Sequence, residues 1–193
     1  MGSVSTKDII VEVAGRLFSR YGFHKTSMDE IARTARKAKG SLYYHFASKE
    51  ELFREVIFKE FESFKNQLEI ITTDTRLSAF EKIKHYLLKR MEILNTATNY
   101  HETLQADFFE KFHFVDQLRN DLTKWEKEKL HAMILQGIAK GEIKLNEHID
   151  VLLDMLLMVL KGLEIPFFLQ KQYNNYAPYF EGLIDILNKG IST

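Results

Sequence analysis

The stretch TSMDEIARTARKAKGSLYYHFASKEELF, residues 26–53, contains short helical patterns separated by a basic turn. Ser27 with Glu30, and later Ser48 with Glu51, have the spacing of capping boxes. In such a box the side chains of both residues satisfy free N–H groups at the start of a helix. The stretch therefore predicts three helical segments, over 27–35, from about 39, and from 48.

The second of these segments carries an unusual set of polar aromatic side chains. Leu42 and Phe46 are four residues apart, so they predict an inward face. At about 100° per residue, the positions just before and between them turn outward or flank that face. These positions are Gly40, Ser41, Tyr43, Tyr44 and His45. Hydroxyl and imidazole groups bond phosphate oxygens, and a glycine lets a backbone approach closely, so the segment suits the surface of a nucleic acid.

With an amphipathic helix predicted over 7–21, these segments form a helix-turn-helix within a three-helix head. In this motif the second helix enters the major groove of DNA. We predict that Lys39 and Ser41 influence sequence preference, while the aromatic residues and Lys49 contact phosphates. For Tyr43 alone, a place in the seam between head and body is the alternative. The predicted DNA-binding residues are Ser27, Lys37, Lys39, Gly40, Ser41, Tyr43, Tyr44, His45 and Lys49.

The distribution of charge supports a polyanionic partner for the head. The 193-residue chain has 27 basic and 27 acidic residues and thus no net charge. Residues 1–50 nevertheless contain nine Lys or Arg against five Asp or Glu, a net charge of +4, which leaves −4 for residues 51–193. A basic head on an acidic body is a modest electrostatic footprint for DNA.

The remaining sequence predicts long helices and no strand. Apolar residues recur at helical spacing, and no alternating β-branched segment is bounded by turn residues. The predicted helices cover 48–71, 78–97, 102–112, 115–140, 147–169 with a perturbation at Pro166, and 175–190. We therefore predict an all-α protein with a DNA-binding domain over 1–48 and a helical effector-binding and dimerisation domain over 49–193.

Residues 26–53 closely resemble the TetR family of bacterial transcriptional repressors. From Ile31 through the run Gly40 to Phe46 and on to Lys49, the spacing matches the head of that family without a gap. The body resembles the family loosely, mainly through ILQGIAKGEIK at 134–144. One departure is the turn at 36–38, which is Arg-Lys-Ala where the family usually has glycine followed by valine and serine. Arginine adopts a left-handed turn less easily than glycine, and Ala38 offers no capping oxygen.

The resemblance implies a homodimer held by the last two long helices. Residues 149–163 are apolar nearly all round, so both sides of this helix need to be covered. One side can face its own bundle and the other a partner subunit, although burial within one subunit is the alternative. The predicted dimer residues are Leu152, Leu156, Val159, Leu160, Leu163, Tyr179, Leu183 and Ile186.

The resemblance also implies that the body encloses a small molecule. Aromatic and methionine positions suggest an apolar or amphipathic effector of unknown identity, and His113 or Asn99 could orient it. Such a ligand would shift the long helix from Ser48, which begins at the head, and thereby change the spacing of the two heads. The predicted ligand-binding residues are Phe64, Leu68, Met91, Phe108, Phe112, His113, Trp125, Met133 and Met155.

Other classes of function have little support in the sequence. There is no phosphate loop, HExxH motif or nucleophile elbow, so we expect no enzyme, no cofactor and no metal. The chain lacks cysteine, a signal pattern and a membrane-length apolar run, so we expect a cytoplasmic protein. The prediction is a ligand-responsive regulator, expected to act as a repressor, that binds a palindromic operator as a homodimer. The alternative is a DNA-binding regulator without a small-molecule effector, either architectural or protein-sensing.

Overall fold

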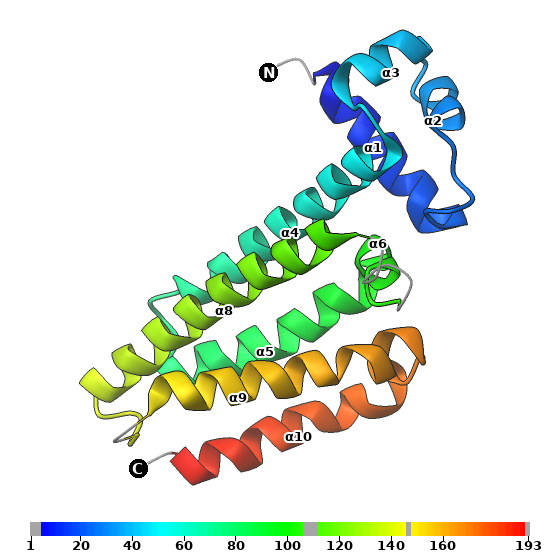
Figure 1. The fold of residues 1–193 in the computed structure, drawn as a ribbon. Helices are drawn as coiled ribbons and strands as arrows, with labels where there is room; N and C mark the ends of the chain where they lie inside the picture. The colour runs from blue at the N-terminus through cyan, green and yellow to red at the C-terminus, as the bar shows by residue number, and fades with distance from the viewer. Residues whose placement is uncertain (1–4, 106–111, 146–147, 192–193) are drawn as a thin grey trace. The chain divides into compact units, whose positions relative to one another are not determined.

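The computed structural model describes residues 5–105, 112–145 and 148–191, and these residues form helices and no β-strand (Figure 1). The all-α prediction is confirmed. The elements are α1 (Thr6–Tyr21), α2 (Met28–Thr34), α3 (Lys39–His45), α4 (Lys49–Thr72), α5 (Ala79–Thr96), α6 (Thr98–Glu102), α8 (His113–Ala139), α9 (Ile149–Gly162), the π-helical segment η1 (Ile165–Leu169) and α10 (Tyr173–Ile191).

By their contacts, the residues divide into two compact units. Unit 1 comprises 1–62 and 97–115, and unit 2 comprises 63–96 and 116–193. Unit 1 therefore contains the helix-turn-helix, the first part of α4 and the short helix α6. The predicted functional boundary at residue 48 divides the chain differently and stays a prediction.

The core of unit 1 is built around three phenylalanine rings. Phe18 of α1 lies edge-on to Phe53 of α4, with ring centroids 5.2 Å apart. Phe23, from the loop after α1, closes the cluster at 4.9 Å from Phe53. The inward residues of α3, Leu42 and Phe46, are also buried, as their spacing predicts. Burial of these apolar faces fixes α2 and α3 on α1 and leaves the opposite face of α3 exposed.

Both predicted helix starts are present, and the turn between α2 and α3 departs from the usual geometry. The Oγ atoms of Ser27 and Ser48 accept hydrogen bonds from N–H groups three residues later, at 3.2 and 3.1 Å. Arg36 has the left-handed φ of 54° that favours glycine. Ala38 makes no side-chain cap at the start of α3. The turn thus combines a strained residue with an uncapped helix.

Helix α6 is attached to α4 within unit 1 through a buried carboxylate. Glu60 accepts hydrogen bonds from Asn99 Nδ2 at 2.7 Å and from the Tyr100 backbone N–H at 3.0 Å. It thereby supplies the acceptor that Ala97 lacks at the start of α6. The predicted helix over 102–112 is wrong at its start, because α6 ends at Glu102 and Thr103 donates its hydroxyl back to the Tyr100 carbonyl at 2.6 Å. Residues 106–111 lie outside the described residues.

Unit 2 is a bundle of α5, α8, α9 and α10 with the second part of α4. Lys84 of α5 pairs with Asp185 of α10 at 2.8 Å, and Lys127 of α8 pairs with Asp154 of α9 at 2.8 Å. Gly137 of α8 packs closely against the start of α5, because an added Cβ would be 2.7 Å from Ala79 Cβ. The predicted perturbation at Pro166 is confirmed, because α9 ends at Gly162 and Pro166 lies in the π-helical segment.

Candidate functional site

The outer face of α3 presents polar aromatic side chains to solvent. Tyr44 is 84% exposed and Tyr43 is 44% exposed. The Tyr44 ring meets His45 edge-on at 5.1 Å between centroids. Gly40 is exposed, and a Cβ added there would meet nothing within 4 Å. Ser41 is partly exposed beside it, so the predicted outward residues do lie on the surface of the unit.

A hollow of about 480 Å³ adjoins this face within unit 1. It brings together four of the predicted DNA-binding residues, Ser27, Lys39, Tyr43 and Lys49. Lys39 pairs with Asp29 at 2.8 Å, and this hydrogen-bonded contact raises the pKa of the lysine. The side chain of Lys39 is thus held beside the hollow in its charged form. We call this feature the head hollow.

Lys49 plays a structural part in the head hollow that its sequence position does not reveal. Its ammonium donates to the carbonyl oxygens of Phe23 at 2.9 Å and Thr26 at 3.1 Å. It also lies 3.5 Å from the His24 carbonyl and 4.4 Å from the centre of the Phe23 ring. The three ammonium hydrogens are therefore directed at the loop before α2, and the predicted phosphate contact of Lys49 stays a prediction.

Sequence reasoning missed five residues that line the head hollow, among them His24 and Lys25. His24 and Lys25 are both exposed, and both line it next to Ser27. The available signal was a basic pair directly before a capping box, at the entrance to the first helix of the motif. Lys37, which was predicted, is partly exposed in the turn and does not line the hollow.

Unit 2 exposes an apolar face on its last two helices. The exposed positions of α9 recur at helical spacing, as do those of α10, so each helix presents one stripe. Exposed large apolar groups gathered in this way mark an interaction surface. The residues of this α9–α10 face are Val151, Leu152, Met155, Met158, Val159, Tyr176, Tyr179, Leu183 and Ile186.

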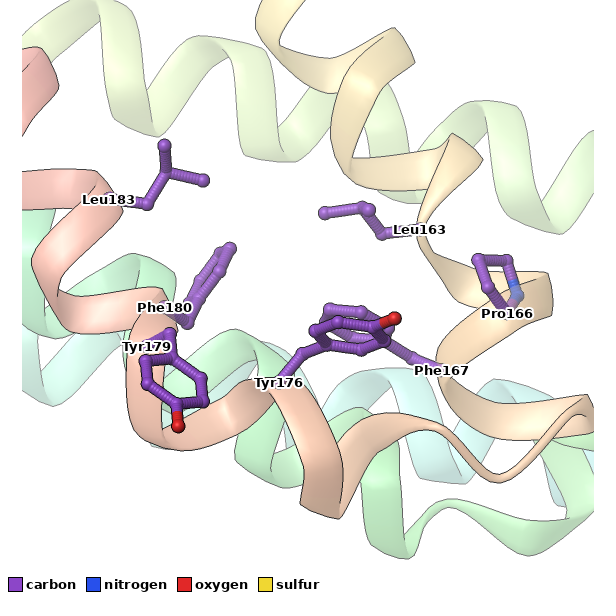
Figure 2. Close-up of a pocket in the computed structure, with 7 residues that line it drawn as sticks. All are labelled: Leu163, Pro166, Phe167, Tyr176, Tyr179, Phe180 and Leu183. Carbon is purple, nitrogen blue, oxygen red and sulfur yellow. The ribbon is translucent and has the colours of Figure 1, made fainter.

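A groove of about 340 Å³ lies between the α10 stripe and the segment that follows α9 (Figure 2). The Tyr176 ring is stacked on Phe167, with centroids 6.0 Å apart and planes 11° apart. Leu163, Pro166, Tyr179, Phe180 and Leu183 complete the lining. The groove is almost wholly apolar, so it suits an apolar side chain of a partner protein.

The structure places six of the eight predicted dimer residues on this face or in its groove. They are Leu152, Val159, Leu163, Tyr179, Leu183 and Ile186. Leu156 is half-buried. Leu160 requires a correction, because it is 2% exposed and lies in the core of unit 2. Leu153 and Leu157 are buried with it, so the inward stripe of α9 runs through these residues.

The predicted ligand-binding residues separate into different places. Buried side chains of unit 2 include four of them, Phe64, Leu68, Met91 and Met133. Trp125 is partly exposed and lies edge-on to Phe64 at 6.4 Å between centroids. These five residues stay candidates for an effector site.

Of the remaining four, Met155 requires a correction. It is 55% exposed on the α9–α10 face, because it shares the outward stripe of Leu152 and Val159. Phe112 packs on Phe23 in unit 1 at 5.5 Å, and His113 is exposed at the start of α8. Phe108 lies outside the described residues.

A buried ion network crosses unit 2 and was not predicted. The Arg90 guanidinium bonds Glu126 at 2.8 Å and Glu164 at 3.0 Å, and Arg119 bonds Glu164 at 3.1 Å. Tyr86 donates its hydroxyl to Glu126 at 3.0 Å, and burial raises the pKa of this phenol well above 10.0. Two arginines thus pair with two glutamates, and the network ties α5 and α8 to the segment that follows α9.

No group of three or more potential metal-ligating side chains occurs among the residues that the structure describes. Within the same residues, no helix is long and apolar enough to cross a membrane.

The head of the chain matches a known protein family. Residues 10–56 match the family model for bacterial regulatory proteins of the tetR family. Over 152 residues, the chain is 28% identical to the HTH-type transcriptional regulator QacR of Staphylococcus aureus, a match that covers 75% of this chain and 77% of QacR.

Solved structures extend the likeness to the whole fold. A transcriptional regulator from Cytophaga hutchinsonii superposes with a TM-score of 0.82 at 24% identity, over 96% of this chain and 98% of that one. The regulator FadR of Bacillus subtilis, solved in complex with stearoyl-CoA, gives a TM-score of 0.74 at 20% identity, over 95% and 98% of the two chains. At these identities the likeness shows a common fold.

Proposed function

Since the chain belongs to the TetR family of bacterial regulatory proteins, we propose that this transcriptional regulator binds a near-palindromic operator as a homodimer and is released from it by a small amphipathic effector. The observation that carries the proposal is the exposed outer face of α3. Tyr44 is largely exposed there, with Gly40 and Ser41 beside it on the same short helix.

The DNA-binding part of the proposal rests on the chemistry around this face. Hydroxyl and imidazole groups position a helix on the sugar–phosphate backbone, and we propose that Lys39 and Ser41 contact base edges. The basic residues Lys25 and Lys39 line the head hollow next to this face. They supply the positive charge that phosphate binding requires.

The dimeric part rests on the α9–α10 face. A symmetric dimer would cover its exposed apolar stripes with the same stripes of a second copy. The two recognition helices of such a dimer reach half-sites about 34 Å apart, or somewhat more. A near-palindromic operator follows from this symmetry.

The effector part rests on the composition of unit 2 and on the relatives. Phe64, Met91 and Met133 are buried in its interior, and apolar side chains of this kind line most small-molecule sites. FadR, which shares the fold, was solved with stearoyl-CoA. An amphipathic molecule is therefore the class of effector that we propose.

The test selects an operator from random DNA with the full-length protein and measures affinity at several salt concentrations. Selection of a two-fold symmetric sequence bound by two chains, with weaker binding at higher salt, supports the proposal. Recovery of no preferred sequence would refute operator recognition. If specific DNA binding never responds to any small molecule, the alternative regulator without an effector is correct.

A further inference from the structure

The head hollow contains a carboxylate among its basic and neutral groups. Asp29, in the first turn of α2, lines the hollow together with Lys25, Lys39 and Lys49. No other acidic residue of the described chain lines it. DNA is a polyanion, so phosphates repel a carboxylate on a DNA-facing surface. The phosphate contacts proposed for the head therefore leave Asp29 without a role.

Asp29 is paired with the first residue of α3. The Lys39 ammonium lies 2.8 Å from Asp29 Oδ1 and 3.0 Å from Oδ2, and it also lies 5.9 Å from the centre of the Tyr43 ring. Both charged side chains are largely exposed, so the pair contributes little to the stability of the free protein. It does place a hydrogen-bond donor and an acceptor side by side in the lining of the hollow.

This pair matches the edge of a G·C base pair in the major groove. Guanine presents two acceptors there, N7 and O6, and cytosine presents the N4 amino donor. O6 and N4 are hydrogen-bonded to each other in the base pair, so they are about 2.9 Å apart. The Lys39 ammonium and the Asp29 carboxylate have the same spacing. A carboxylate has about four acceptor sites, so Asp29 can hold the lysine and accept from cytosine together.

An A·T base pair fits the same two side chains less well. Thymine O4 and adenine N6 are also an acceptor beside a donor, but the thymine methyl group flanks O4 and the adenine N7 acceptor flanks N6. The lysine would lose its second acceptor, and the carboxylate would face the lone pair of N7. Lys39 is the first residue of α3, and the N-terminal residues of a recognition helix are those that contact base edges.

We propose that Asp29 and Lys39 together read one G·C base pair in each half-site of the operator. This inference rests on the proposed function, because it assumes that α3 binds DNA in a sequence-specific way. Asp29 rejects a base that places an acceptor opposite it, since two acceptors share no hydrogen. It thus adds specificity while it lowers the affinity for DNA in general.

The experiment measures the sequence preference of the full-length Asp29→Ala protein. Operator selection gives the half-site that the wild type prefers, and each base pair of it is then replaced in turn in binding titrations at fixed salt. We expect the wild type to lose at least about tenfold in affinity when one particular G·C pair is replaced. In Asp29→Ala this loss should be at least about fivefold smaller. Affinity for non-specific DNA should rise, because a charge that repels phosphates is gone.

Glu12→Ala is the matched control. Glu12 is 67% exposed, against 64% for Asp29, and it pairs with Arg16 at 2.6 Å on α1 without lining the hollow. Its loss should leave the preference at every base pair unchanged. Lys39→Met should weaken the preference at the same G·C pair as Asp29→Ala does. Denaturant unfolding shows whether each variant is folded.

The outcomes separate this inference from the proposed function. Selection of no preferred sequence by the wild type would refute the proposed function. A preferred operator whose base-pair preferences are all unchanged in Asp29→Ala would overturn this inference alone, as would an effect of Asp29→Ala on an A·T pair instead. An equal loss of affinity for every sequence would also overturn it, because a carboxylate that only stabilises α2 does not discriminate between bases.

Discussion

The ammonium of Lys49 lies 2.9 Å from the carbonyl oxygen of Phe23, and the same charge sits 4.4 Å from the centre of the Phe23 ring. The first turn of α4 is thereby joined to the loop that precedes α2. A cation that donates to backbone carbonyls satisfies acceptors that the loop leaves without helical partners. Lys49 thus holds the entrance to the helix-turn-helix in position.

This relationship predicts that Lys49→Met destabilises the head. Loss of hydrogen bonds from a charged donor should cost about 1–3 kcal/mol, measured by denaturant unfolding. Operator affinity should fall because the head is less ordered, while the log–log salt slope should stay unchanged. Lys25→Met is the control, since a lost phosphate contact should reduce that slope by about 0.9 without a change in stability. A reduced slope for Lys49→Met would show that Lys49 contacts phosphate directly.

The left-handed turn predicts a stabilising substitution at Arg36. A side chain at φ 54° costs about 1–2 kcal/mol, and glycine removes that strain but adds about 0.5–1 kcal/mol of chain entropy in the unfolded state. Arg36→Gly should therefore raise the free energy of unfolding by about 0.5–1 kcal/mol. Arg33→Gly, inside α2, should lower it by about 1 kcal/mol. Equal destabilisation by both glycines would argue against the left-handed conformation.

The uncapped start of α3 predicts that Ala38→Ser stabilises the head. Ala38 has the extended backbone of an N-cap residue but no side-chain oxygen. A serine there should accept from an N–H group of the first turn and add about 1 kcal/mol of stability. Ala38→Val, which offers no capping oxygen either, should change stability little by comparison. Hydrogen exchange of the α3 amides would show whether the gain is local.

The α9–α10 face predicts opposite effects for two neighbouring residues. Val159 is 62% exposed, so Val159→Glu should leave the subunit folded and weaken the dimer at least about 30-fold, or about 2 kcal/mol. Leu160 is buried, so Leu160→Glu should unfold the subunit. Leu135→Glu, at an exposed apolar position of α8, is the control that should remain dimeric. Sedimentation velocity distinguishes these outcomes, and a dimeric Val159→Glu protein would place the interface elsewhere.

The contribution of Glu60 to the free energy of unfolding should decrease as pH rises. Burial raises its pKa above 4.5, despite the hydrogen bonds from Asn99 and Tyr100 that lower it. The folded state therefore binds the proton more tightly than the unfolded state. The contribution of Glu60 is complete below pH 4.5 and is lost as pH rises through the folded value.

The measurement is the unfolding free energy of the wild type relative to Glu60→Gln as a function of pH. This difference should decline with rising pH. Glu81 provides a control of opposite sign, because hydrogen bonds from Ser78 lower its pKa. The wild type should gain stability relative to Glu81→Gln as pH rises toward 4.5 from below, because the folded pKa of Glu81 lies under that value. A flat profile for Glu60 would mean that its carboxyl group is solvated.

Local signals account for the parts of the fold that the sequence predicts well. Capping serines and apolar periodicity depend on residues three or four apart, so Ser27, Ser48 and the helices they begin are recognisable without a structure. The same reasoning identified the exposed face of α3. The resemblance to the TetR family marked the turn at 36–38 as a departure, and the left-handed φ of Arg36 is a finding of the structure.

Contacts between distant residues account for what the sequence does not predict. Arg90, Glu126 and Glu164 belong to different elements, and no spacing rule links them. Periodicity shows that α9 is apolar all round, but it does not show which stripe its own bundle covers, so Leu160 and Met155 were assigned to the wrong sides. The role of Lys49 depends on loop carbonyls more than twenty residues away.

Gly137 sets how closely α8 and α5 pack in unit 2. An added Cβ would be 2.6 Å from Ile143 Cδ1 and 2.7 Å from Ala79 Cβ, so the side chains of Ile143 and Ala79 pack directly on the Gly137 backbone. Any side chain at position 137 would force these neighbours apart. The close fit between the end of α8 and the start of α5 therefore depends on the absence of a Cβ at this position.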